Sequence, residues 1–307
     1  MKSKLWLIFA LTTTISWGIW GAFIEVTEQA GFPATLGYVV WSLTMIPPAL
    51  IALKLVNWKI EYDLKSIGFG AAIGFLGAGG QLILFHGLGI GPAYIIFPII
   101  ALSPVITVSL SILILKESTQ FKGWIGIALA LIAIPLLAYQ PPDNTAVDGY
   151  LWFILALGVF FAWGIQGFFM KFANETMSAE SIFFYMALTG VLLSPIAIMM
   201  TDFSQDINWG FKGPYLAAMI QVLNAIGALC LVYAYRYGKA IVVSPLTNAV
   251  APVITIIISL TLYAVFPHTV TLIGMILAII ATFLLAVVEE STEKVEEMEE
   301  ILEEITE

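Results

Sequence analysis

The sequence has 307 residues, of which 60% are hydrophobic and only 11% are charged, and its mean hydropathy is +0.98. Soluble domains are about half apolar and about one quarter charged, so this composition excludes an ordinary water-soluble fold and predicts a chain surrounded by lipid. The formal net charge of −9 comes from residues 289–307, which hold ten glutamates and one lysine. The acidity therefore describes a tail, and no nucleic-acid partner is expected.

Ten apolar runs fill the rest of the chain, and each is close to the roughly 20 residues that a helix needs to cross a bilayer. Barrel strands would be about half as long and would alternate apolar with polar residues. We therefore expect an all-α integral membrane protein with ten transmembrane helices and no soluble catalytic domain, metal or cofactor. The runs lie near residues 4–24, 34–55, 65–87, 92–115, 121–139, 149–170, 179–200, 214–235, 240–265 and 269–288.

Lysine and arginine indicate how these helices are oriented, because they accumulate in short cytoplasmic loops. With a cytoplasmic N-terminus, eleven of the twelve basic residues fall in inside loops or at inner helix ends, and only Lys212 falls outside. The pattern predicts that both termini face the cytoplasm, in a multi-pass protein of the inner, cytoplasmic membrane.

A short phrase occurs twice, as SWGIWGAF at residues 16–23 and AWGIQGFF at residues 162–169. Further matches follow in the same order: PVIT recurs at 104–107 and 252–255, and WIGIALALIA at 124–133 parallels LIGMILAIIA at 272–281. Five spans separate the starts of the two phrases, so the copies should run in opposite directions. We expect two inverted five-helix repeats at 1–140 and 141–288, followed by an acidic cytoplasmic tail at 289–307.

The paired Trp-Gly phrases and the run GPAYIIFPIIALSPVI with its following ILKE resemble the drug/metabolite transporter superfamily, in its ten-helix EamA-like branch. The resemblance covers residues 1–288. It implies a transporter of small metabolites, in many members an exporter. It also assigns to Glu117 the glutamate that follows the family's fourth helix, for which the second half, with Val265 and Phe266 nearby, has no counterpart.

Inverted repeats are typical of secondary transporters, whose substrate sites lie near the midplane where discontinuous helices meet. Prolines interrupt the two halves at matching places, and amides buried in lipid should face the interior because they need partners. Two tryptophans lie near mid-depth in the paired phrases, where an indole suits the wall of a cavity. The predicted substrate-binding residues are therefore Trp17, Trp20, Gln81, Pro98, Trp163, Gln166, Asn224, Pro245 and Asn248. For the prolines, amides and tryptophans alike, helix packing alone is the alternative.

No acid or base lies at the centre of a predicted span, so the cargo is expected to be a neutral, zwitterionic or amphipathic metabolite. His86 and Glu25, near the outer ends of their spans, are the candidates for a proton site, with an ordinary interfacial role as the alternative. An uncoupled facilitator or channel for small neutral solutes stays open as a second function. An enzyme is not expected, since no nucleophile with a partnered base is present.

Two further segments carry helical patterns, namely the acidic tail and a glycine-rich stretch of the third apolar run. Residues 295–305 place apolar side chains at helical spacing, which leaves open a helix, a self-association strip that would form a homodimer, or disorder. The glycines of residues 68–80, including Gly70 and Gly74, have the small-xxx-small spacing of a tight helix contact between membrane helices.

Overall fold

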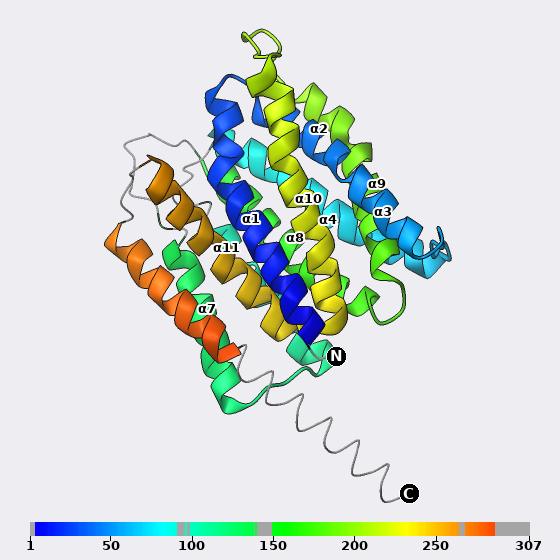
Figure 1. Cartoon of the computed structure of the whole chain (residues 1–307), viewed down its shortest axis with the longest axis vertical. Coiled ribbons are helices and arrows are strands. Elements are labelled where there is room, and N and C mark those ends of the chain that lie inside the picture. Colours follow the sequence, from blue (N-terminus) through cyan, green and yellow to red (C-terminus); the bar gives the residue numbers. More distant parts are fainter. Residues whose placement is uncertain are drawn as a thin grey trace, which may run out of the picture.

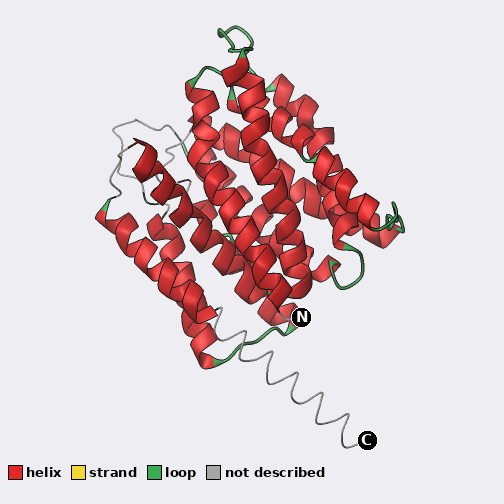
Figure 2. Cartoon of the chain, viewed as in Figure 1, coloured by secondary structure: helices red, strands yellow, loops and turns green. Residues whose placement is uncertain are grey.

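A computed structural model of the chain describes residues 4–90, 96, 99–137, 139, 149–263 and 268–285. Every regular element in these ranges is a helix (Figure 2). Pro98 and the predicted acidic tail lie outside the described residues. The helices are, in chain order, α1 Leu5–Gln29, α2 Ala34–Thr44, α3 Ile46–Leu55, α4 Leu64–Ile90, α6 Pro104–Leu110, the π-type turn η2 Ser111–Leu115, α7 Phe121–Leu137, α8 Leu151–Ala173, α9 Ala179–Met199, the π-type turn η3 Phe211–Tyr215, α10 Leu216–Tyr237, α11 Ala240–Tyr263 and a last helix at Thr269–Leu285.

Seven of the described helical segments are long and apolar enough to cross a membrane, with α2 and α3 forming one segment and η3 and α10 another. Three further apolar helices have 17 residues or fewer in the described part, at Ile99–Leu115, Phe121–Leu137 and Thr269–Leu285. These three lie within the runs predicted at 92–115, 121–139 and 269–288. The chain is a multi-pass membrane protein with an all-helical architecture.

Helix boundaries follow local chemistry. α2 ends at Thr44 and α3 begins at Ile46 because Pro47 and Pro48 lack the N–H groups that would continue the hydrogen-bond ladder. α1 ends before Gly31, which adopts a φ of +88°. The N-cap of α9 is Ser178, whose side chain accepts a 3.2 Å hydrogen bond from the backbone N–H of Ser181.

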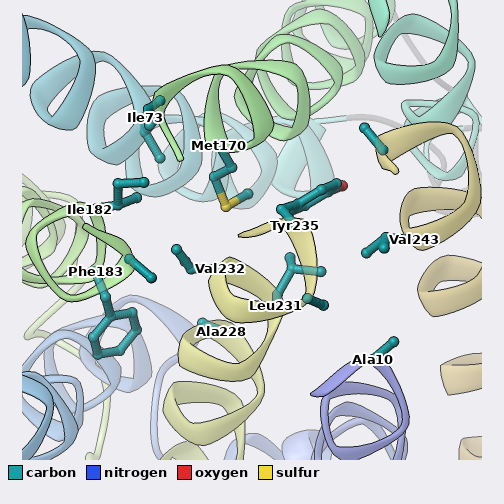
Figure 3. Close-up of a cluster of buried hydrophobic side chains, with 14 of the residues drawn as sticks. Ala10, Ile73, Met170, Ile182, Phe183, Ala228, Leu231, Val232, Tyr235 and Val243 are labelled. Carbon is teal, nitrogen blue, oxygen red and sulfur yellow. The ribbon is translucent and has the colours of Figure 1, made fainter. Parts of the chain in front are cut away.

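The long helices form a bundle in which α1 lies beside α10 and α11, while α4 lies beside α8 and α9 (Figure 1). α2 and α3 cover α9 on one flank, and α7 packs beside α11 on the other. The largest buried cluster joins residues from both halves of the sequence, including Ala10, Ile73, Met170 and Tyr235 (Figure 3). A second cluster joins α7, α11 and the helix at Thr269–Leu285. The core is therefore shared between the halves.

The glycines of the repeated phrase allow the halves to approach closely. Gly18 lies against Ile254 of α11, and Gly164 lies against Ile106 of α6. In α4, Gly70 lies against Tyr185 and Gly74 against Thr189, both of α9. The predicted packing role of Gly70 and Gly74 is confirmed.

Threonines of the repeated PVIT motif bond to the same phrase. Thr255 Oγ1 donates to the carbonyl oxygen of Gly18 at 2.9 Å, and Thr107 Oγ1 donates to that of Gly164 at 2.8 Å. Each bond crosses from one half of the sequence to the other. The contact between halves is thus made twice, by corresponding residues.

The prolines behave differently in the two halves. α6 begins at Pro104, directly after a turn at Leu102 and Ser103, so the helical path is broken there. α11 instead continues through both Pro245 and Pro252. The matched interruption predicted from the sequence is therefore present in the first half only, among the described residues.

Candidate functional site: a central cavity between the halves

A cavity of about 300 Å³ lies between the halves, and it is walled by α1, α2, α4, α6, α8, α9, α10 and α11. Among the described residues, no aspartate, glutamate, lysine, arginine or histidine lines it. The wall is built from four indoles, three methionines, four carboxamides and smaller side chains: Trp17, Trp20, Trp41, Met45, Gly74, Gly77, Ala78, Gln81, Ser103, Thr107, Trp163, Gln166, Gly167, Met170, Met186, Asn224, Ala228, Leu231, Tyr235, Ser244 and Asn248.

All four indole N–H groups of this wall are bonded to protein acceptors. Trp17 donates to the carbonyl oxygen of Asn224 at 3.2 Å and Trp163 to that of Gly77 at 3.3 Å. Trp41 donates to the side-chain oxygen of Asn224 at 2.8 Å, and Trp20 donates to a side-chain oxygen of Gln221 at 2.9 Å. The tryptophans therefore offer the cavity their ring carbons, with no free donor.

The carboxamides differ in how far they are bonded. Asn248 donates to the carbonyl oxygen of Ser244, one turn back in α11, at 2.9 Å, and Asn224 accepts from Trp41. The side chains of Gln81 and Gln166 make no hydrogen bond to any described residue. These two glutamines are the carboxamides of the wall whose side-chain oxygen and nitrogen are both left for a molecule in the cavity.

Seven of the nine residues predicted for the site line this cavity, namely the three tryptophans, the two glutamines and the two asparagines. Pro245 lies in α11 but does not line the cavity, whereas its neighbours Ser244 and Asn248 do. Pro98 lies outside the described residues.

Of the two candidates for a proton site, His86 does not line the cavity. His86 is exposed and lies in a separate hollow with Thr35, Phe85, Ile90 and Met200. Glu25 belongs to α1, but its side chain is not among those described.

Trp41, Tyr235 and the three methionines were missed by sequence reasoning. Trp41 belongs to neither copy of the repeated phrase, which directed attention to Trp17 and Trp163. A signal did exist, since Trp41 lies inside an apolar run and away from its ends, where interfacial tryptophans concentrate. Tyr235 is the last residue of the apolar run at 214–235, so its position in the sequence does not indicate a place in the cavity wall.

A charged cluster lies at the end of α8, beyond the cavity. Oε2 of Glu117 accepts a 3.0 Å hydrogen bond from the backbone N–H of Ile241, at the start of α11. Nζ of Lys171 lies 3.9 Å from Oε1 of Glu117 and donates to the carbonyl oxygen of Gly238 at 2.9 Å. An acidic group at a helix N-terminus is stabilised by the helix dipole. The glutamate of the first half therefore holds α8 and α11 of the second half together.

A second polar cluster joins the loop after α3 to the start of α9. The carboxylate of Glu61 accepts hydrogen bonds from Ser181 Oγ, from Ser178 Oγ at 2.8 Å and from the Ser178 backbone N–H at 3.3 Å. Burial raises the pKa of Glu61, but the hydrogen bonds from Ser181 and Ser178 outweigh burial and hold it below its ordinary value. The charged form of Glu61 thus stabilises the junction between the two halves at this loop.

The sequence profile of the EamA-like transporter family matches the chain twice, over residues 4–139 and 150–287. The chain belongs to this family. EamA-like proteins are membrane transporters of small molecules, so the family indicates transport, and not catalysis, for this chain. The double match also assigns one copy of the family unit to each half of the sequence.

Individual relatives extend this similarity. An uncharacterised protein of Methanocaldococcus jannaschii, MJ1333.1, is 33% identical over 43% of this EamA-like chain and 95% of its own length. Protein LicB of Haemophilus influenzae is 24% identical over 76% of this chain and 81% of its own. A solved crystal structure that is only 15% identical superposes with a TM-score of 0.70, covering 93% of this chain and 98% of its own, and supports the fold alone.

Proposed function

We propose that this protein is a secondary transporter that moves a small organic cargo through the central cavity by alternating access, in the direction of export. The observation that carries the proposal is the cavity itself, which lies at the junction of the two family units and is walled by corresponding residues of both. Transporter sites are expected at such a junction.

The proposal includes ten membrane spans arranged as two inverted halves, with both termini in the cytoplasm. Contacts around Gly238 support the inverted arrangement. Trp6, at the start of α1, packs against Gly238, and Lys171, near the end of α8, bonds to its carbonyl oxygen. α1 begins near Gly238 and its counterpart α8 ends there, so the two corresponding helices run in opposite directions.

The cavity wall supports an uncharged, zwitterionic or amphipathic cargo. A strongly charged molecule would lose its hydration in a wall where, among the described residues, nothing carries a compensating charge. Indole faces are suited to apolar groups, and they also attract an ammonium group such as that of a zwitterion.

The test is solute flux in proteoliposomes, measured as counterflow and as gradient-driven accumulation across a panel of neutral, zwitterionic and ammonium-bearing metabolites. Accumulation that requires a proton or sodium gradient is the expected result, and flux that only equilibrates would identify an uncoupled facilitator instead. A cavity-filling variant, Ala228→Phe, should abolish flux. Its matched control, Ile257→Phe, adds the same ring at an exposed position of α11 and should leave flux unchanged. Equal flux in both would contradict transport through this cavity.

A further inference from the structure

The two family units differ at the positions that shape the cavity wall. Trp20 and Gln166 occupy the same place in the repeated phrase, 146 residues apart. In the first unit, the Trp20 indole is bonded to Gln221 of α10. In the second unit, Gln166 takes the place of Trp20 and lies against Gly77 of the glycine-rich helix α4.

The difference places the two carboxamides that make no side-chain hydrogen bond to a described residue on one wall of the cavity. With the offset of 147 residues that relates Gly80 to Gly227, Gln221 corresponds to Gly74, and Gln81 corresponds to Ala228. The α1–α10 side thus carries the Trp20 indole, which is bonded to the amide of Gln221. By contrast, α4 and α8 present the two unbonded amides of Gln81 and Gln166 beside small residues. Gly77 and Gln81 lie one helical turn apart on the same face of α4, and Gln81 and Gln166 line the same cavity.

We infer that Gln81 and Gln166 form a polar subsite that fixes the orientation of an amphipathic cargo. The subsite takes an uncharged group that both donates and accepts hydrogen bonds, such as a primary amide. The apolar part of the cargo lies against the indoles of Trp17, Trp20 and Trp41. This inference rests on the proposed function for the identity of the cavity as a cargo site.

The physical reason for selectivity is that a glutamine amide that a bound cargo shields from water loses free energy when it is left without a partner. A cargo with both a donor and an acceptor satisfies the two glutamines, whereas a cargo with an acceptor alone leaves a glutamine oxygen unbonded. The expected discrimination is about tenfold in affinity, the usual size of one unmade hydrogen bond.

A pair of isosteric probes isolates this effect. 2-Phenylacetamide and phenylacetone differ only by an NH₂ group in place of a CH₃ group. Their binding to the purified full-length protein in detergent is measured by ligand-observed NMR, with empty micelles of the same detergent as the baseline. The unaltered protein is expected to bind phenylacetamide about tenfold more tightly than phenylacetone.

Substitution of either glutamine should remove the preference. Gln166→Leu and Gln81→Leu are expected to bring the affinity ratio close to one while phenylacetone still binds. Neither glutamine is bonded to a described residue, so these variants should fold.

A glycine pair gives a control that retains both amides. Gly77→Ala would displace Gln166, because a methyl group there overlaps the Gln166 amide, and the ratio should fall. Gly79→Ala, two residues along α4, meets nothing within 4 Å and should keep the ratio.

Three results would overturn the inference: a ratio near one in the unaltered protein, no binding of either probe, or a ratio that survives both leucine substitutions. Flux in proteoliposomes separates this failure from failure of the proposed function. Binding with the expected ratio but no flux of any solute would refute transport and leave the subsite in place. Flux together with an affinity ratio that stays the same in both leucine variants would refute the subsite alone.

Discussion

The indole nitrogen of Trp41 donates a 2.8 Å hydrogen bond to the side-chain oxygen of Asn224. This bond joins α2 to α10 across the wall of the cavity and occupies the side-chain oxygen of Asn224. The backbone carbonyl of the same asparagine accepts from Trp17. Asn224 therefore positions two of the four indoles that a cargo would meet.

Asn224→Ala should weaken cargo handling without unfolding the protein. The substitution releases the Trp41 indole and leaves its N–H without an acceptor, which corresponds to about 1–3 kcal/mol. We expect about a tenfold rise in the KM for flux and a changed tryptophan emission spectrum. Asn224→Asp keeps the acceptor and should preserve the emission spectrum. Val222→Ala, exposed on the same helix, serves as the control. Unchanged flux and emission in Asn224→Ala would contradict this role.

Gly164→Ala should be strongly destabilising, whereas Gly158→Ala in the same helix should not. A methyl group at Gly164 would lie 2.7 Å from the backbone oxygen of Ser103, and this contact cannot relax by rotation of a side chain. Overpacking of this kind costs about 1–3 kcal/mol. Gly158 has nothing within 4 Å, so alanine there should maintain or raise stability. The comparison is made by thermal unfolding in detergent. Equal melting temperatures would refute the close contact.

Glu117 and Lys171 should be energetically coupled. Glu117→Gln keeps an acceptor for the Ile241 N–H but leaves Lys171 without its counter-charge, and Lys171→Met leaves the nearly buried carboxylate unpaired. Each single substitution is expected to cost about 2 kcal/mol or more, and the double variant should cost less than the sum of the two. Thermal unfolding of the four proteins closes the cycle, with exposed Lys122→Met as a control. Strict additivity would show that the pair does not interact.

Glu61 should make stability depend on pH at the acid side. Hydrogen bonds from Ser181 and Ser178 hold its pKa in the folded protein below the ordinary value of an unfolded chain. The stabilisation is therefore complete above the unfolded-state pKa and is lost as the pH falls through the folded-state pKa. The melting temperature, followed from about pH 6 to pH 3, should fall less in Glu61→Gln than in the unaltered protein. Parallel curves would contradict the role of this carboxylate.

Much of the architecture could be predicted because membrane helices carry strong signals. A run of about 20 apolar residues has few alternative structures in lipid, so α1, α4, α8 and α9 lie where the hydropathy places them. Helix continuity was harder to predict. Pro104 and Pro252 stand in identical PVIT motifs, yet only the first begins a helix. Neighbouring side chains decide whether the groups freed by a proline are satisfied in place, and the motif alone does not contain them.

For the candidate site, the cavity-lining tryptophans and amides could be selected because few polar groups lie deep in the spans and each needs a partner. Which of them are already satisfied could not be predicted. The contrast between the bonded Trp20 and the unbonded Gln166 depends on Gln221 and Gly77, which lie on other helices and become neighbours only in the fold. The Glu117–Lys171 pair could not be predicted either, because its members are 54 residues apart in the sequence and become neighbours only in the fold.

The correspondence of Trp20 with Gln166 also bears on how such a protein diversifies. Each unit of the repeat is encoded separately, so one codon change alters a single wall of the cavity. The glycines and threonines that lock the units together, such as Gly18 and Thr107, need not change with it. The lining of the cavity can therefore change one residue at a time, while the contacts that join the two units are kept.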